Sequence, residues 1–188
     1  MNKQTYHTII IGATSFGAGL ATSLSKEGKK VLIVEALHST ASDFSAPLKG
    51  EKCDFTKQNN LLSKFLLTHE IAREDGLWLP QALPCAIANV LSDHSIECLY
   101  NCIPTKVTQK ADGTFRLSVI SRRGALILHA NNMVDTTALG SLPTPDGSGF
   151  AKKHEYTTAL RAVCFGSPTK APSPFETISI YDDSLFLL

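Results

Sequence analysis

The clearest structural signal in the chain is in residues 6–35, YHTIIIGATSFGAGLATSLSKEGKKVLIVE. An apolar run ends in a turn at Gly12, and small residues at helical spacing follow over about 15–27. Gly28 stands where a helix C-terminus favours a left-handed residue, and a second apolar run occupies 31–34. Neither apolar run alternates with polar residues, which is typical of strands in a parallel sheet covered on both faces. The stretch therefore predicts a β-α-β unit.

After this unit, the apolar pattern is first absent and then returns at spacings that predict helices and short strands. Residues 36–57 are rich in Ser, Thr, Asp, Pro and Lys and predict a long surface connection. Apolar residues at three- and four-residue spacings predict a helix over about 58–74, and a second helix is expected to start at Pro84. The strands expected after these helices lie at about 96–100, 105–110, 114–121, 125–130 and 132–136.

Three of these strands are joined by turn-forming pairs at the spacing of tight hairpins. The pairs are Asp112-Gly113 and Arg123-Gly124, so residues 105–130 predict an antiparallel β-meander that leads into the strand at 132–136. We therefore expect an α/β fold with a Rossmann-like parallel sheet, helices on both faces of that sheet, and the meander as one crossover.

The turn after the first strand has the sequence Gly12-Ala13-Thr14-Ser15-Phe16-Gly17. It follows a strand and opens a helix, which is the context of the dinucleotide fingerprint G-x-G-x-x-G. In that fingerprint the first Gly makes the tight turn, the second lets a pyrophosphate approach the backbone, and the third allows close packing of helix on strand. Gly12 and Gly17 match the first and third positions, and Thr14 occupies the second. We expect the Thr14 side chain to weaken or shift nucleotide binding.

An acidic residue supports the nucleotide interpretation independently. Glu35 closes the second strand 23 positions after Gly12, where a carboxylate would accept hydrogen bonds from an adenosine ribose. The same charge repels a 2′-phosphate, so a phosphorylated nicotinamide cofactor is not favoured. The alternative interpretation is structural: Gly12 and Gly17 serve only the geometry of the turn, and Glu35 is a solvated strand end.

These residues resemble those of the FAD-dependent oxidoreductases with a glutathione-reductase-like FAD/NAD(P)-binding fold. The segment 9–17 and the pair Val34-Glu35 resemble the family's pyrophosphate loop and ribose acid, and the expected meander resembles the family's crossover. Residues 133–140, MVDTTALG, are similar to the family's second motif, a strand that ends in Asp-Ala-Thr-Gly-Asp. The resemblance spans about residues 6–140.

The resemblance implies that the chain binds the ADP part of FAD. The residues implied in cofactor binding are Gly12, Ala13, Thr14, Ser15, Phe16, Gly17, Glu35, Val107, Asp135 and Thr137. Among them, Val107 resembles the meander residue whose backbone meets adenine, and Asp135 and Thr137 belong to the second motif. The flavin would carry the redox chemistry. No residue of the chain matches a flavin-side catalytic position, so catalytic residues stay unassigned.

Three residues depart from the family's pattern. Thr14 and Ala138 stand where the family has Gly, and Leu139 stands where it has Asp. The first two changes add a side chain along the expected path of the cofactor, and the third removes a charge from it. FAD binding is therefore expected to be weak or lost. Family members also run to several hundred residues. We therefore expect an FAD-binding Rossmann-like domain at residues 1–140, followed by an incomplete second region or C-terminal extension at residues 141–188.

These observations leave three functions open. The first is an FAD-dependent oxidoreductase-like chain that needs a partner chain or a missing C-terminal half. The second is a non-catalytic or degenerate structural subunit that has lost FAD binding. The third is a short-chain dehydrogenase-like NAD-binding protein, because Gly12-Ala13-Thr14 and Phe16 resemble the Gly-Ala-Thr-Gly-Phe turn of that family. Its Tyr-x-x-x-Lys pair is missing, since Tyr156 is followed four positions later by Leu160.

The composition of the chain bears on which classes of partner and which cellular compartment are expected. The 188 residues include 18 basic and 17 acidic side chains, a net charge of +1 without basic clusters, so we expect no nucleic-acid partner. No apolar stretch approaches the ~18 residues of a membrane span, and the five cysteines lack metal-ligand spacing. We expect a cytoplasmic protein with reduced thiols and no metal. The apolar end at 185–188 predicts a partner chain or a homo-oligomer that covers it.

Overall fold

A computed structural model of the chain describes residues 5–41, 54–57, 61–76 and 79–137, together with three short strands further along. The main elements in chain order are β1 (Thr5–Ile11), α1 (Ser15–Lys26), β2 (Val31–Val34), α3 (Leu61–Thr68), α4 (Leu83–Asp93), β3 (Glu97–Leu99), β4 (Ile103–Gln109), β5 (Phe115–Ser121) and β6 (Gly124–Asp135). Single 3₁₀ turns at Phe55–Lys57 and Pro80–Ala82 precede α3 and α4. No helix in these described ranges is long and apolar enough to cross a membrane.

The strands β1 to β6 form one six-stranded sheet in the order β3-β2-β1-β6-β5-β4. The neighbours β3, β2, β1 and β6 run parallel to one another, and β6, β5 and β4 run antiparallel. The predicted α/β class, the β-α-β unit and the antiparallel meander are therefore confirmed.

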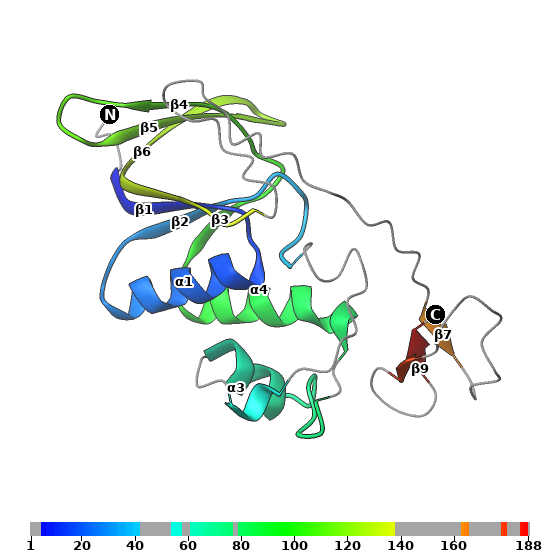
Figure 1. Cartoon of the computed structure of the whole chain (residues 1–188). Helices are drawn as coiled ribbons and strands as arrows, with labels where there is room; N and C mark the ends of the chain where they lie inside the picture. The colour runs from blue at the N-terminus through cyan, green and yellow to red at the C-terminus, as the bar shows by residue number, and fades with distance from the viewer. Residues whose placement is uncertain are drawn as a thin grey trace, which may run out of the picture.

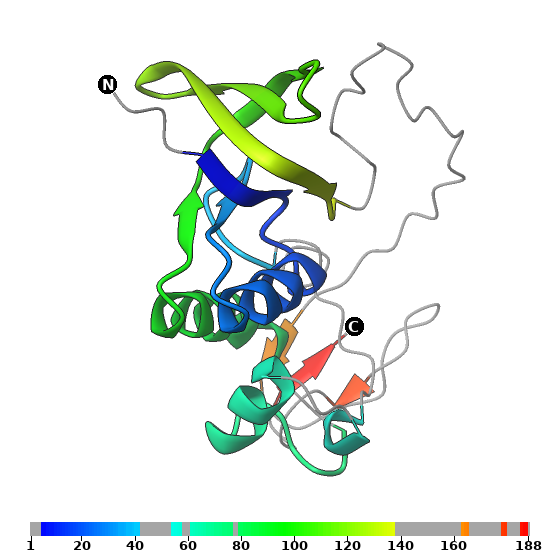
Figure 2. The same cartoon turned by 90° about the vertical axis from the view of Figure 1, so that its left-hand side faces the viewer.

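The last meander strand and the parallel strand after it are one continuous element. Sequence patterns predicted two strands, at 125–130 and 132–136, which meet at polar Asn131 and Asn132. The structure has a single strand of 12 residues, β6, which pairs with β5 in its first part and with β1 in its second. Both Asn side chains are exposed and Asn132 donates to the carbonyl of His7, so the polar pair does not interrupt the strand. Figure 2 shows β6 running from the meander down beside β1.

The parallel part of the sheet is covered by helices on one face and by the meander on the other (Figure 1). On the helix side, Ile10 and Ile33 pack with buried residues of α1 and α4, such as Ala21 and Ile87. On the other side, alternate strand residues pack against the meander; they include Ile9, Ile11, Leu32 and Val34, in contact with Val107, Leu117 and Val119. The prediction of helices on both faces is thus wrong for the described residues. The meander provides the second apolar layer because its own strands alternate buried and exposed residues.

The helices follow the expected pattern, with one difference at an end. Gly28 closes α1 with a left-handed φ of 72°, as its sequence position predicted. The helix expected over 58–74 ends earlier, at Thr68. Glu70 adopts a φ of 57° there, and the N–H groups of Ile71 and Ala72 both return to the carbonyl of Leu66. Helical spacing of apolar residues therefore continues past the point where the backbone has left the helix.

A second, three-stranded antiparallel sheet comprises β7 (Val163–Phe165), β8 (Ile178–Ser179) and β9 (Leu185–Leu187), in the order β7-β9-β8. The expected boundary near residue 140 stays a prediction. Several predictions concern residues outside the described ranges, namely residues 42–53 of the expected connection, which include Cys53, and Ala138, Leu139, Tyr156 and Leu188.

Candidate functional site

The carboxyl ends of three parallel strands meet at one edge of the sheet. The register pairs Ile11 of β1 with Val34 of β2 on one side and with Asp135 of β6 on the other. The residues that follow these strands, Gly12, Glu35 and Thr136, therefore lie next to one another. In an open parallel sheet, this edge is where ligands bind.

Two glycines permit the close approach of β1, α1 and β6 at this edge. Gly12 has a φ of 95°, and its N–H donates to the carbonyl of Val34 at 2.8 Å. A Cβ at Gly12 would lie 3.0 Å from Cγ2 of Thr137. A Cβ at Gly17 would lie 2.4 Å from the carbonyl oxygen of Gly12. Both positions thus need glycine for the reasons that the sequence suggested, namely a tight turn and close helix–strand packing.

Thr14 caps α1 and connects it to β6. Its hydroxyl oxygen accepts a hydrogen bond from the N–H of Gly17 at 3.0 Å, which is the usual N-cap arrangement. The same hydroxyl donates to Oγ1 of Thr136 at 3.1 Å, and Thr136 donates to the carbonyls of Ile11 and Gly12 at 2.9 Å each. The sequence predicted Thr14 at the site but not Thr136, because the second motif pointed to its neighbours on either side, Asp135 and Thr137.

The first turn of α1 leaves backbone donors open. Within the described part of the chain, the N–H groups of Thr14, Ser15 and Phe16 have no hydrogen-bond partner. Such donors at a helix N-terminus, together with the helix dipole, favour a bound anion. Phe16 itself is 71% exposed at this end of the helix. The turn can therefore hold a phosphate group through its backbone.

Glu35 lies directly beside the turn, and its carboxylate is buried. One carboxylate oxygen accepts from the N–H of Ala13 at 2.7 Å and the other from the N–H of Leu37 at 2.8 Å. The segment after β2 then folds back over the turn, where the N–H of Ala41 donates to the carbonyl of Ala13 at 2.8 Å. Glu35 is only 5% exposed, so the alternative that it is a solvated strand end is wrong. Each oxygen keeps a lone pair that could accept a further hydrogen bond.

The second motif closes the same edge from the side of β6. Asp135 accepts hydrogen bonds from the N–H of Thr137 at 2.9 Å and from the Thr137 hydroxyl at 2.7 Å. This local turn brings the Thr137 side chain against Gly12. Val107, by contrast, lies in the middle of β4 with its side chain in the core between the meander and the sheet. The structure therefore brings together all the predicted site residues except Val107.

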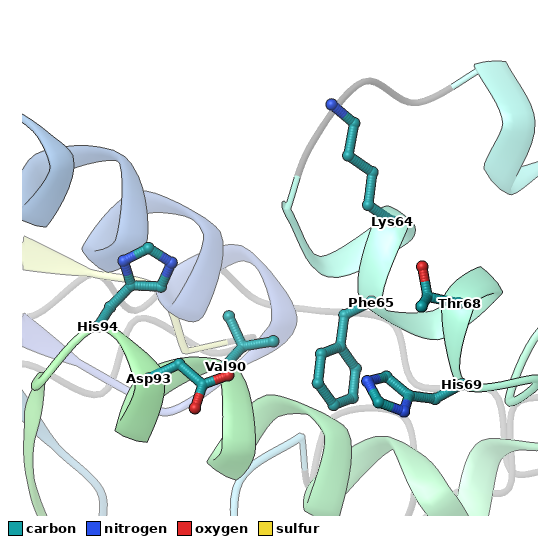
Figure 3. A pocket seen from close by; sticks show the side chains of 7 residues that line it. All are labelled: Lys64, Phe65, Thr68, His69, Val90, Asp93 and His94. Carbon is teal, nitrogen blue, oxygen red and sulfur yellow. The ribbon is translucent and has the colours of Figure 1, made fainter.

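A hollow of about 220 Å³ lies elsewhere, between α3 and α4 (Figure 3). Its residues are Lys64, Phe65, Thr68, His69, Val90, Asp93 and His94. The rings of Phe65 and His69 lie 4.1 Å apart and point toward α4. None of the predicted cofactor residues lines this hollow. No group of metal-ligating side chains occurs among the described residues.

The cysteines near the sheet are structural. Cys98 lies on the helix side and Cys102 on the meander side, so the two belong to different apolar layers. Burial raises the pKa of both thiols. A raised pKa makes a thiol a poorer nucleophile at neutral pH, so neither residue is suited to thiolate chemistry.

The similarity of this chain to known proteins lies in its structure and not in its sequence. No protein-family model matches the sequence, and no curated protein matches it. Solved structures do match. They include AlpK (TM-score 0.62, 13% identity) and the anhydrotetracycline hydroxylase OxyS from Streptomyces rimosus (TM-score 0.60, 17% identity), each over 98% of this chain. A flavoprotein/dehydrogenase from Cytophaga hutchinsonii matches 70% of the chain at 15% identity, with a TM-score of 0.52.

The chain shares its fold with these three proteins. It covers 44% of the length of AlpK and of OxyS and 39% of the Cytophaga protein, so it spans less than half of each. At these identities the likeness concerns the arrangement of strands and helices. It does not extend to the substrates or activities of those proteins.

Proposed function

We propose that this chain is the ADP-binding part of an FAD-dependent oxidoreductase of the glutathione-reductase-like type. The observation that carries the proposal is the set of open N–H groups at Thr14, Ser15 and Phe16, placed beside the buried carboxylate of Glu35. Phosphate oxygens need donors and ribose hydroxyls need acceptors, and this edge of the sheet offers both. The shared fold supports FAD as the dinucleotide.

Each part of the site has a role in this proposal. The backbone between Gly12 and Gly17 would hold the pyrophosphate, and Glu35 would accept from the ribose. Asp135 and Thr137 would hold the end of β6 against the dinucleotide. Val107 does not lie at this edge, so a contact between its backbone and adenine stays a separate prediction from the family resemblance. When bound, the flavin supplies the hydride or electron transfer. The chain's own residues bind and orient the cofactor.

Oxidoreductase activity would need more protein than these elements provide. No residue of the chain matches a flavin-side catalytic position of the family, so none is assigned a role at the flavin ring or a substrate. We therefore propose that activity requires a further region of protein, either a partner chain or a C-terminal half. The apolar sequence at 185–188 supports a covering partner or a homo-oligomer. Light scattering of the purified chain tests for the homo-oligomer.

The second candidate function is a degenerate structural subunit that no longer holds FAD. Two observations favour it. The N–H of Gly17 already donates to the Thr14 hydroxyl, and both carboxylate oxygens of Glu35 already accept hydrogen bonds from backbone N–H groups. A short-chain dehydrogenase-like function is the weakest of the three, because the crossover between β3 and β6 is an antiparallel meander.

Nucleotide binding separates the first two functions in one experiment. The purified chain is examined for absorbance near ~450 nm and for its thermal unfolding with FAD, ADP or FMN in excess. At a concentration of 100 times Kd, a ligand adds about 2.7 kcal/mol to stability, which corresponds to a rise in Tm of about 5–10 °C. FAD and ADP should both raise Tm. FMN lacks the ADP part and should not. A colourless protein with no shift in FAD or ADP would instead support the degenerate subunit.

A further inference from the structure

We propose that Thr14 and Thr136 form a hydroxyl latch that keeps the Gly12–Gly17 turn closed in the absence of ligand, and that a nucleotide phosphate must open it to accept a hydrogen bond from the N–H of Gly17. The latch is the chain of hydrogen bonds through the two hydroxyls. This inference rests on the proposed function, because it concerns the same turn. It assigns the control of nucleotide affinity to two residues that are 122 positions apart in the sequence.

The hydrogen bonds of the latch follow a single direction. The N–H of Gly17 donates to Thr14, the Thr14 hydroxyl donates to Thr136, and the Thr136 hydroxyl donates to the carbonyls of Ile11 and Gly12. Each hydroxyl has one proton to give, and this order uses both. Thr14 is only 6% exposed, so water competes little for these bonds. The two hydroxyls thus connect the N-terminus of α1 to the ends of β1 and β6.

A helix cap alone does not require this arrangement. Capping α1 needs only the bond from Gly17 to Thr14. The bond from Thr14 to Thr136 adds a tie between helix and strand. Position 17 must also lack a side chain for this tie, since a Cβ there would lie 2.7 Å from Oγ1 of Thr136. Three residues from two distant motifs are therefore matched to one another.

The latch competes directly with a bound phosphate. The N–H of Gly17 has one proton, and it points to the Thr14 oxygen. A phosphate oxygen can take this donor only if the Thr14 side chain rotates away, which also breaks its bond to Thr136. A charged acceptor forms the stronger hydrogen bond, so the exchange is possible but reduces the net affinity. The open N–H groups of Ser15 and Phe16 remain available throughout.

The test measures ADP binding by calorimetry on the full chain and on variants of the latch. Thr14→Gly removes the latch at little cost, because Gly is tolerated at an N-cap. We expect it to bind ADP about fivefold tighter, the equivalent of one capping hydrogen bond. Thr136→Ala should bind about two- to threefold tighter, and the double variant no tighter than Thr14→Gly, since both act on one network. Thr14→Ser restores the hydroxyl and should bind like the wild type.

Thr22→Ala is the matched control. Thr22 is buried in the same helix, and its hydroxyl donates to the carbonyl of Gly19 within the helix. Its removal should leave the Kd for ADP unchanged. A second readout needs no nucleotide: amide hydrogen exchange of Gly17 should be about fivefold faster in Thr14→Gly than in the wild type, because the N–H loses a bond worth about 1 kcal/mol.

The outcomes separate this inference from the proposed function. If wild type and Thr14→Gly bind ADP equally, or if Thr14→Gly binds more weakly, the latch is wrong while the nucleotide site stands. If neither ADP nor FAD binds to the wild type or to any variant, both the proposed function and the competition are wrong. Tighter binding by Thr14→Gly and by Thr136→Ala, with Thr22→Ala unchanged, supports the latch.

Discussion

Gly17→Ala measures how closely α1 lies on the sheet. A methyl group at this position would meet the carbonyl oxygen of Gly12 at 2.4 Å and Oγ1 of Thr136 at 2.7 Å. Contacts under 3.0 Å are essentially never seen for real Cβ atoms, so something must move. The nearer atom belongs to the main chain of the turn and cannot rotate away. The helix must therefore shift from β1, or the turn must deform.

The size of the effect follows from two opposing contributions. Forcing an extra carbon into a packed site costs about 1–3 kcal/mol, and a clash with main chain belongs at the upper end of that range. Alanine gains about 0.5–1 kcal/mol over glycine within a helix. The net expectation is a loss of about 2 kcal/mol in the free energy of unfolding, or a fall in Tm of about 4–8 °C.

The assay is urea unfolding followed by far-ultraviolet circular dichroism. Gly19→Ala is the matched control, because it lies in the same helix and a Cβ there would meet nothing within 4 Å. It should stabilise the protein by about 0.5–1 kcal/mol. The two substitutions thus have the same chemistry and opposite signs. In a Thr136→Ala background, Gly17→Ala should recover only part of the loss, since the clash with Gly12 remains.

Two results would refute this reasoning. One is a Gly17→Ala variant as stable as Gly19→Ala, which would mean that α1 does not lie against the turn as described. The other is full recovery in the Thr136→Ala background. That outcome would mean that the Thr136 hydroxyl, rather than the main chain of Gly12, limits the approach.

Four further predictions concern the same edge and its surroundings. Glu35→Gln places a donor against one of two backbone N–H groups, so the free energy of unfolding should fall by about 1–3 kcal/mol in urea unfolding; a neutral change would contradict the buried carboxylate. Cys102 should react with Ellman's reagent far more slowly than exposed Cys85, as peptide mapping would show. Because burial raises the pKa of the folded Cys102 thiol above its usual 9.0, stability should be constant below that pH and fall above it, which unfolding at stepped pH measures. Phe16→Ala should change the free energy of unfolding by less than about 0.5 kcal/mol, since the side chain is 71% exposed, and a larger loss would show that it is packed.

The sequence predicted most of what local rules determine. The β-α-β unit follows from apolar runs and from Gly12, Gly17 and Gly28, whose positions in the turn and at the helix end can be recognised from the local sequence. The hairpins of the meander likewise follow from their turn pairs. The placement of Glu35 beside the turn also follows, because adjacent parallel strands end at one edge. These features need no knowledge of distant contacts.

The features that it did not predict depend on the tertiary structure. Helices were expected on both faces of the sheet, but the meander covers one face. Its buried apolar residues pack against the apolar residues of that face. The burial of Glu35 depends on the segment ending at Ala41, which folds back over Ala13. The role of Thr136 depends on its position opposite Thr14, which no spacing in the sequence could show. The features that the sequence did not predict are therefore those that depend on contacts between distant segments.

The dual membership of β6 has a consequence for how the chain folds. Its first part pairs with β5 through a tight hairpin, whereas its last part pairs with β1, and the bond from Thr136 to Ile11 closes a loop of 125 positions. Local pairing closes with little loss of chain entropy, and long loops close later. We therefore expect the meander to form first and to present the end of β6 as a template on which β1 docks. The nucleotide edge, which depends on that last docking step, would be the final part of the sheet to assemble.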